Sequence, residues 1–421
     1  GESTSTESGS SGGAGADGRA PSGSGGGLGA LSPGDRTTVG GVDAAGGFGP
    51  ASQRVHFEVR ASQPSYWRTG AFDQYTGDGW RSTARDRPYD GGEVVRADEN
   101  GDRIVQRVTL RRSATSLPAA WRPVALAGTE ADLRMTEFGS FRGESAVPAN
   151  TTYRVLSSEP VREPTRLRAA GERYPRAVEE RYTRLPDDTE RLASFTGEIT
   201  ADADSPYETA VAVESWLETN KAYSLNASRD EGGAASQFVF EMERGYCQHF
   251  ATAMAVMLRT QDVPARYVVG YSTGQQVDDR YVVRGMNAHA WVEVYFPDVG
   301  WVRFDPTPGS ERLSAEQRAF AQEAPGGPGG AGESGGSGGS GGSGEGDSSA
   351  QSSTGDTGSY AHSERGSPGE SFSAGGGQSG ESGEAGESGD SGESGDSGES
   401  GDSGDSGDSG ESGDSGESGD S

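Results

Sequence analysis

Cysteine and lysine are almost absent from this chain of 421 residues, which contains one of each, Cys247 and Lys221. A single cysteine excludes a disulfide framework within the chain. The remaining basic residues are arginines, and 65 acidic residues against 36 basic ones give a net charge of −29. Nucleic acid is therefore not an expected partner, because its phosphates would be repelled.

Long apolar runs are absent as well. No stretch approaches the roughly 18–20 consecutive apolar residues that a membrane-spanning helix needs. No charged and then apolar signal segment opens the sequence. None of these residues is therefore predicted to cross a membrane.

Both ends lack the apolar residues that a core needs. Residues 1–50 are rich in Gly and Ser, and residues 316–421 change into Ser-Gly-Asp and Ser-Gly-Glu triplets after residue 379. After residue 323 there are 20 acidic residues and one arginine, so this part carries a net charge of −19 and the rest of the chain −10. We predict that both ends are disordered. The acidic tail is then a spacer or a solvating brush, unless its biased composition has no role.

The residues between these ends are predicted to form an α+β structure. Residues 51–160 contain alternating segments such as 55–59 (VHFEV), broken by Gly, Pro and Asp, which is typical of a small antiparallel β-rich domain. From residue 161 the pattern becomes helical, and we place a second domain at 161–315.

Cys247 stands in residues 245–251 (GYCQHFA), directly before an apolar run that ends at Leu258. This run is apolar almost all round, so it predicts a buried helix with Cys247 in an exposed first turn. The unpaired N–H groups and the dipole of a helix N-terminus stabilise an anion, and the thiolate is the reactive form of cysteine. Cys247 is therefore a candidate nucleophile.

Short runs of β-branched and aromatic residues follow, at 265–271, 280–284, 289–296 and 301–305. Gly, Asp and Pro separate these runs, which is typical of antiparallel strands. We therefore predict that the Cys247 helix packs on an antiparallel meander.

His289 and Asp305 lie in the last two of these strands. A period of two puts His289 on the same face as Tyr295, and Asp305 on the same face as Trp301. If Tyr295 pairs with Trp301 across a hairpin, Asp305 lies diagonally opposite His289 and within its reach. The sequence thus predicts that one nitrogen of His289 faces Cys247 and the other faces Asp305, as in a nucleophile, base and orienting carboxylate.

These motifs resemble the transglutaminase-like superfamily, in its membrane-associated prokaryotic branch, whose catalytic domain lies outside the membrane between transmembrane segments. The similar segments are residues 243–251 (ERGYCQHFA), 263–266 (VPAR), 269–271 (VGY), 289–295 (HAWVEVY) and 300–307 (GWVRFDPT). The resemblance implies a papain-like core, with the Cys-bearing helix packed on an antiparallel sheet. It also implies Cys247 as nucleophile, His289 as general base and Asp305 as orienting carboxylate, with no cofactor and no metal ion.

The function expected from this resemblance is that of a cell-surface cysteine enzyme. Cys247 would attack an amide carbonyl, and the thioester would pass to an amine or to water. The expected oxyanion donor is the backbone N–H of Cys247, since it points out of the helix start. The expected partner is a protein or peptide substrate at the extracellular face of the cell membrane, with membrane association through segments absent from this chain.

Three alternatives compete with this interpretation. A cysteine peptidase of the same fold uses the same residues. Zinc binding by Cys247, His249, His289 and Asp305 is weaker, because Cys-x-His at a helix start is not a usual ligand pair. A non-catalytic surface-binding or cell-wall-organising module is the third, and the presence of cysteine, histidine and aspartate together argues against it.

The near-absence of lysine and the acidic excess also resemble the composition of proteins from extreme halophiles. High salt screens repulsion between like charges, so we expect the melting temperature to rise as salt increases above physiological levels. Removing everything after Glu316 should leave the melting temperature in molar salt nearly unchanged, because the Debye length there is about 3 Å. A large drop in a thermal unfolding scan would show instead that the tail packs on the folded part.

Overall fold

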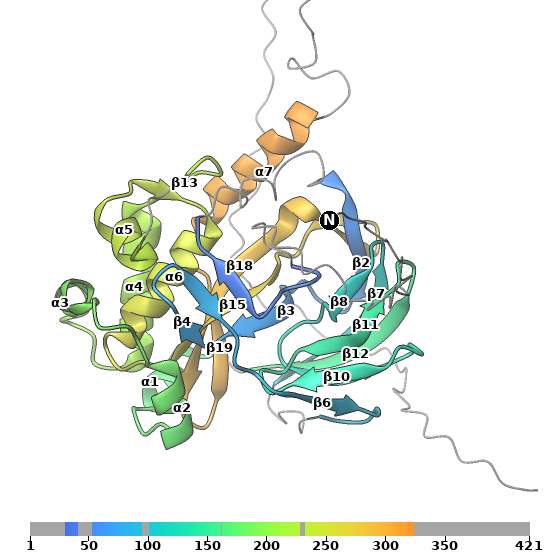
Figure 1. Cartoon of the computed structure of the whole chain (residues 1–421), viewed down its shortest axis with the longest axis horizontal. Helices are drawn as coiled ribbons and strands as arrows, with labels where there is room; N and C mark the ends of the chain where they lie inside the picture. The colour runs from blue at the N-terminus through green and yellow to red at the C-terminus, as the bar shows by residue number, and fades with distance from the viewer. Residues whose placement is uncertain (1–29, 41–52, 95–100, 161, 228–231, 324–421) are drawn as a thin grey trace, which may run out of the picture. The chain divides into compact units, whose positions relative to one another are not determined.

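The molecule contains more than one hydrophobic core, and helix α6 (Cys247–Arg259) lies within the larger one (Figure 1). The computed structural model describes residues 30–40, 53–94, 101–160, 162–227 and 232–323. Every residue of α6 is buried, as the apolar run predicts. The helix packs against α4 (Pro206–Asn220), α5 (Ala234–Phe240), β15 (Ala265–Tyr271) and β18 (Ala288–Phe296).

Helices fill much of the segment from residue 162 to residue 220, in agreement with its predicted helical pattern. They are α1 (Pro164–Ala169), α2 (Arg176–Tyr182), α3 (Glu190–Ile199) and α4. The start of α4 is fixed by Ser205, whose hydroxyl accepts a hydrogen bond from the Glu208 N–H at 3.3 Å. Pro206 occupies the first turn, where its missing N–H removes no helical hydrogen bond. Figure 1 shows these helices together on one side of α6.

Four antiparallel strands form the sheet that packs on α6, which we call the central sheet. Their order is β19 (Gly300–Phe304), β18, β15 and β3 (Trp67–Phe72). Tyr295 pairs with Trp301, so the predicted register of the hairpin is confirmed. Val292 and Val294 of β18 join the core around α6, whereas Trp291 lies in a separate cluster.

Two further antiparallel sheets form the β-rich part of the molecule. One has the order β16 (Gln275–Val277), β17 (Arg280–Arg284), β2 (Val55–Ala61), β7 (Asp102–Leu110), β12 (Thr152–Glu159) and β9 (Pro123–Ala127). The other has the order β6 (Asp86–Tyr89), β10 (Leu133–Thr136), β11 (Phe141–Val147) and β8 (Ala114–Leu117). Both contribute to one core, in which Phe57 and Tyr153 of the first sheet lie with Phe141 of the second. The predicted α+β fold with a preceding β-rich region is therefore confirmed.

Each side of the predicted domain boundary contributes a strand to a sheet of the other side. β3 comes from the β-rich segment of the sequence but pairs with β15 in the central sheet. β17 follows β15 in the sequence but pairs with β2 in the six-stranded sheet, so the predicted simple meander is wrong. Local periodicity does not specify a partner so distant in the sequence. The predicted division at residue 160 thus separates the chain by sequence but not by sheet.

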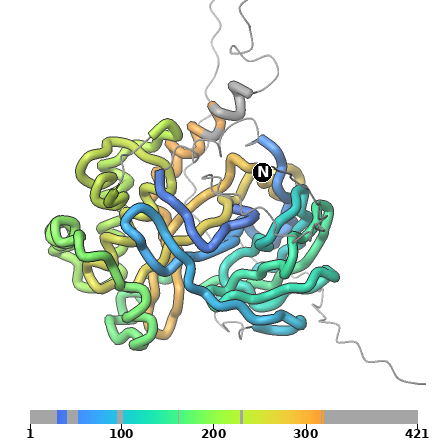
Figure 2. The backbone as a smooth tube through the Cα atoms, in the orientation of Figure 1, coloured from blue at the N-terminus to red at the C-terminus, as the bar shows by residue number. Residues whose placement is uncertain are grey.

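Part of the segment predicted to be a disordered lead-in, residues 1–50, is ordered. β1 (Arg36–Thr38) pairs with β5 (Gly79–Arg81), which also pairs with β4 (Gln74–Tyr75). Figure 2 traces residues 30–40 in blue. Leu31 and Val39 are buried, and the Leu31 carbonyl accepts two backbone hydrogen bonds at 3.0 Å. A few apolar residues in a glycine-rich context are therefore enough to hold this segment on the fold.

The C-terminal boundary predicted at residue 316 is also wrong. Helix α7 (Gly309–Glu323) continues through it, so a deletion that tests the tail belongs after Glu323. Residues 1–29, 41–52 and 324–421 lie outside the described residues, and with them most of the predicted disordered ends. Among the described helices, none combines the length and the hydropathy required to cross a bilayer.

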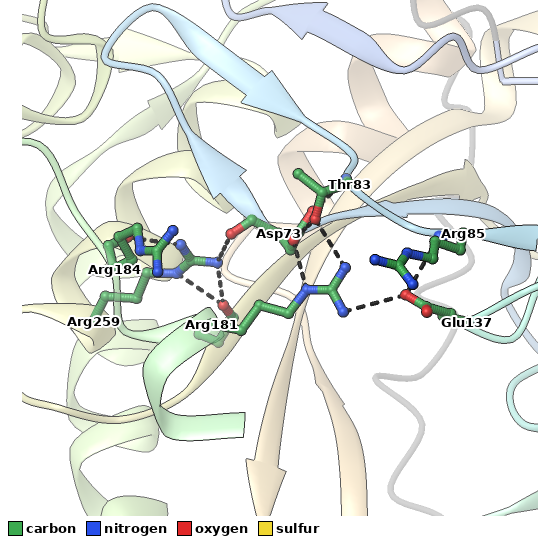
Figure 3. A network of polar contacts seen from close by, with 8 residues as sticks. Asp73, Thr83, Arg85, Glu137, Arg181, Arg184 and Arg259 are labelled. Atoms are coloured by element: carbon green, nitrogen blue, oxygen red, sulfur yellow. Dashed lines mark hydrogen bonds and ion pairs between the residues drawn. The ribbon is translucent and has the colours of Figure 1, made fainter. Parts of the chain in front are cut away.

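Two arginines tie the helical part to the strands (Figure 3). Arg259, the last residue of α6, is buried and donates to the carbonyl oxygens of Asp73, Arg184 and Ala265 at 2.7–3.0 Å. Arg181 of α2 donates from Nε to Asp73 Oδ2 at 2.7 Å. Buried carbonyl groups need donors, and a guanidinium supplies several in one plane. Arg259 therefore fixes the end of α6 against two loops at once.

Glu293 of β18 is completely buried between two arginines. Its Oε1 accepts from Arg68 Nε at 3.0 Å and its Oε2 from Arg266 Nε at 2.7 Å. Both arginine side chains are 2% exposed. Arg68 also donates to Ser140 Oγ at 2.7 Å, and the Trp121 ring lies 4.4 Å from its guanidinium carbon. This ion cluster joins β3, β15 and β18 on one face of the central sheet.

Glu293→Gln should lower the free energy of unfolding by about 3–5 kcal/mol, because it leaves two buried guanidinium groups without their counterion. Urea denaturation measures this change. Glu144→Gln is the matched control, since Glu144 is 65% exposed and lies 4.0 Å from Arg134. That variant should unfold almost as the parent does. Similar small effects in both variants would show that the ion cluster does not hold the strands together.

Candidate active site

Cys247 is the first residue of α6, and the preceding residues are held in place by short strands. β14 (Arg244–Gly245) pairs in parallel with β13 (Ala222–Tyr223). The predicted exposed position of Cys247 is wrong, since the residue is 0% exposed. The helix start lies inside the core, where Tyr246 and Phe238 are buried with it. The thiol is therefore shielded from solvent in this structure.

Gly245 is required by a close approach at the helix start. A Cβ at this position would lie 2.6 Å from the Phe238 ring and 2.9 Å from the His249 Cβ. Such distances are too short for carbon atoms. The chain therefore reaches Cys247 along a path that only glycine permits.

His289 enters the site from β18. The strand begins after a short 3-10 turn, η3 (Gly285–Asn287), and His289 pairs with Gly270 of β15. A Cβ on Gly270 would lie 2.8 Å from the Trp291 ring, so glycine leaves room for the aromatic residue beside His289. The His289 side chain is 1% exposed, and Cys247 is one of the side chains that shift its pKa.

Asp305 follows directly after β19 and contacts the other side of His289. His289 Nε2 and Asp305 Oδ2 are 2.7 Å apart. Extending the hairpin register by one residue puts Asp305 opposite Trp291 and diagonal to His289, as the sequence predicts. Asp305 Oδ1 also accepts from the Thr307 N–H at 3.2 Å. The structure thus brings Cys247, His289 and Asp305 together in the predicted order.

Burial and charge act in opposite directions on His289. Burial alone lowers the pKa of an imidazole, but the adjacent carboxylate of Asp305 and the hydrogen bond to Cys247 raise the pKa of His289 from 6.5 to about 9. Burial would raise the pKa of Asp305, yet His289 and Arg312 hold it well below its ordinary value. The pair is therefore an imidazolium and a carboxylate at neutral pH.

Arg312 of α7 is a second cation at the site. Its side chain is buried, and its Nη1 donates to Ser272 Oγ at 3.3 Å. The charge of Arg312 lowers the pKa of both His289 and Asp305. It therefore stabilises the carboxylate and opposes the imidazolium, and Asp305 outweighs it in the net shift of His289.

Two residues that form hydrogen bonds with Asp305 are not predicted by the sequence. The Tyr66 hydroxyl donates to Asp305 Oδ2 at 2.7 Å, and Glu214 Oε1 accepts from the Asp305 N–H at 2.8 Å. Burial raises the pKa of Glu214 to about 7. Tyr66 lies 239 positions from Asp305 in the sequence, and no local pattern links them. Glu214 directly follows the buried Val213 on α4, which is the only local sign of its role.

His249 has a structural place at the helix start. It is 0% exposed, and its Nδ1 accepts from the Tyr246 N–H at 3.3 Å. Within the described residues, no group of three or more His, Cys, Asp and Glu side chains has an arrangement that could hold a metal ion. The zinc alternative therefore finds no ligand cluster in this part of the chain.

A buried cysteine at a helix start, beside a histidine and an aspartate on the packed sheet, is the arrangement of papain-like cysteine enzymes. Comparison with protein families defines the class further. Residues 193–306 match the transglutaminase-like superfamily, and residues 16–164 match the TgpA N-terminal domain. This chain therefore contains a transglutaminase-like core that follows a TgpA N-terminal domain.

Particular relatives agree with this assignment. YebA of Bacillus subtilis is 30% identical over 287 residues, which cover 60% of this chain and 38% of that protein. A protein-glutamine gamma-glutamyltransferase of Pseudomonas aeruginosa is 26% identical over 262 residues, which cover 60% of this chain and 37% of that protein. The chain thus spans less than two fifths of the length of these relatives.

A solved structure shows the same fold. The crystal structure of the periplasmic domain of TgpA from Pseudomonas aeruginosa matches with a TM-score of 0.54 and 22% identity. The match covers 68% of this chain and 98% of that domain.

Asp305→Asn should lower the pKa of His289 well below 9, because burial and Arg312 then act with no carboxylate to oppose them. A group whose pKa is raised on folding stabilises the fold below its unfolded pKa and loses that contribution as pH rises through the folded pKa. The contribution of His289 is therefore complete below about pH 6.5 and lost as pH rises through about 9. In Asp305→Asn, the free energy of unfolding should therefore no longer decrease as pH rises through about 9 on account of His289.

NMR titration of the imidazole and urea denaturation across the same pH window measure the two effects. Asp298→Asn is the matched control, because Asp298 lies between β18 and β19 with a φ of 60°, which asparagine also adopts. An unchanged His289 midpoint in Asp305→Asn would contradict the assignment of the shift to Asp305.

Proposed function

We propose that this chain carries an acyl-transfer site, in which Cys247 attacks the carbonyl of a glutamine side chain or of a peptide bond. The observation that carries the proposal is the position of His289, whose Nε2 lies 2.7 Å from Asp305 Oδ2 and whose pKa is raised by both Asp305 and Cys247. A cysteine used only for packing needs no such partners.

The first half of the reaction forms a thioester. The Cys247 thiolate, whose proton is held by His289, bonds to the carbonyl carbon, and the carbonyl π electrons move to the oxygen; they return to re-form the carbonyl when the carbon–nitrogen bond breaks. The His289 imidazolium then gives its proton to the leaving nitrogen as the carbon–nitrogen bond breaks, and ammonia or an amine departs. Asp305 accepts the hydrogen bond of His289 throughout and keeps the ring oriented.

The second half of the reaction transfers the acyl group. Neutral His289 takes a proton from an incoming amine or water, which attacks the thioester carbon and expels the Cys247 thiolate. An amine gives a new amide, and water gives a carboxylic acid. Exclusion of water favours the amine, and the burial of Cys247 and His289 supports transfer in this respect.

The backbone N–H of Cys247 is the proposed donor to the oxyanion. Cys247 is the first residue of α6, so its N–H is one of those that the helix leaves unpaired. Such a preorganised donor stabilises the charge that develops on the carbonyl oxygen.

The proposed location is the outer side of the cell membrane, with a protein or peptide substrate at the cell surface. The support comes from the solved relative, which is a periplasmic domain. Membrane attachment would then use segments that are not among these residues. A cysteine peptidase uses the same constellation of residues, so the products of the reaction decide between transfer and cleavage.

Cys247→Ala should abolish the reaction and leave the fold intact, because the thiol is the nucleophile and the methyl group keeps most of its packing. The assay is mass spectrometry of a glutamine-containing peptide incubated with the chain and a primary amine. Transfer adds the amine and removes ammonia, hydrolysis of the side chain converts Gln to Glu, and peptidase activity gives fragments.

Matched histidine variants complete the test. His289→Asn should also lose activity, whereas His56→Asn should keep it, since His56 lies on β2 and is hydrogen-bonded to Tyr271 at 2.7 Å. Cys247 is the only thiol, so an alkylating reagent that labels the parent chain and not Cys247→Ala reports on this residue alone. Full turnover by Cys247→Ala would end the proposal.

A further inference from the structure

Tyr66 reaches the proposed active site from the β-rich segment. It directly precedes β3, and its hydroxyl donates to Asp305 Oδ2 at 2.7 Å. This is the same oxygen that faces His289 Nε2, also at 2.7 Å. One carboxylate oxygen therefore receives two side-chain donors, from residues that are far apart in the sequence.

Three other side chains hold the Tyr66 ring. The His289 ring lies edge-on at 5.5 Å and the Trp291 ring at 5.4 Å between centroids. On the ring face, the guanidinium carbon of Arg303 is 4.0 Å from the centroid, which is a cation–π distance. The ring therefore has little freedom to turn, and the hydroxyl is fixed toward Asp305.

The protonation states make this hydrogen bond one-directional. Burial and the negative charge of Asp305 raise the pKa of Tyr66, so the phenol stays neutral and donates. Asp305 is a carboxylate, so it only accepts. The ionisable groups that face this pair are His289 on β18, Arg303 on β19, Arg312 on α7, Glu214 and Glu218 on α4, and Arg162 before α1.

We propose that Tyr66 is a positioning residue of the Cys247–His289–Asp305 site, acting through Asp305. The proposal rests on the proposed function. The hydroxyl holds the carboxylate in the plane that His289 Nε2 requires, and the ring limits rotation of the imidazole. The β-rich segment thus supplies a part of the catalytic geometry.

Tyr66→Phe isolates the hydroxyl, because it keeps the ring that packs on His289, Trp291 and Arg303. Without the phenol, Asp305 Oδ2 has His289 as its remaining side-chain donor among the described contacts. The carboxylate then attracts the imidazolium more strongly, and the pKa of His289 should rise above its parent value. The kcat should fall roughly tenfold, as expected for a lost hydrogen bond to a charged group. KM should stay unchanged, because Tyr66 acts on Asp305 and not on the substrate.

The experiment is an NMR titration of His289 in the full chain, combined with kcat and KM measurements. The chain has four histidines, so its imidazole spectrum is simple to assign by comparison with His289→Asn. Tyr295→Phe is the matched control, since Tyr295 lies on β18, the same strand as His289, and its ring packs on Trp301. It should leave both the titration and kcat at the parent values.

A double-mutant cycle separates positioning from a general structural role. If Tyr66 acts through Asp305, then Tyr66→Phe has no effect on the His289 midpoint in the Asp305→Asn background. An equal shift in both backgrounds would overturn the proposal, and so would a Tyr66→Phe variant that folds and keeps the parent midpoint and kcat. The titration needs no substrate, so a parent chain that turns over no amide defeats the proposed function while the titration still decides the role of Tyr66.

Discussion

The pairing of β3 with β15 is the contact on which the rest of the structure depends. It aligns Trp67 with Tyr271 and Phe72 with Tyr267, across about 200 positions of sequence. Closing so long a loop is not prohibitive, since each doubling of loop length adds only about 0.6 kcal/mol. The pairing completes the central sheet, and in doing so it carries Tyr66 to Asp305 and Arg68 to Glu293.

The ion cluster around Glu293 is better explained by specificity than by net stability. Replacing buried ion pairs with apolar residues is often neutral or stabilising, because desolvation offsets the attraction between the charges. However, Glu293 is satisfied only when Arg68 and Arg266 approach from β3 and β15 together. A slip of β18 by one residue would turn Glu293 toward the apolar residues of α6. The cluster therefore penalises the wrong register of the central sheet.

The parts of the site that follow local periodicity were predictable from the sequence. The apolar run after Cys247 fixes α6, and the alternation in residues 289–296 fixes the face and register that join His289 to Asp305. Local pattern does not specify the partner of each strand. The sequence therefore did not predict that β17 pairs with β2 or that β3 pairs with β15. Tyr66 was missed for the same reason, and so was the burial of Cys247, which depends on what packs over the helix start.

Two partly buried carboxylates in one site are kept in different protonation states by the groups around them. Asp305 receives hydrogen bonds from His289, Tyr66 and the Thr307 N–H, and these together with Arg312 keep it ionised despite burial. Glu214 receives the Asp305 N–H, and burial raises its pKa to about 7. Only one of the two groups is therefore a full negative charge at neutral pH, and it is the one that faces His289. The imidazolium is thus stabilised by Asp305, and Tyr66 of the β-rich segment donates to the same carboxylate oxygen that faces His289.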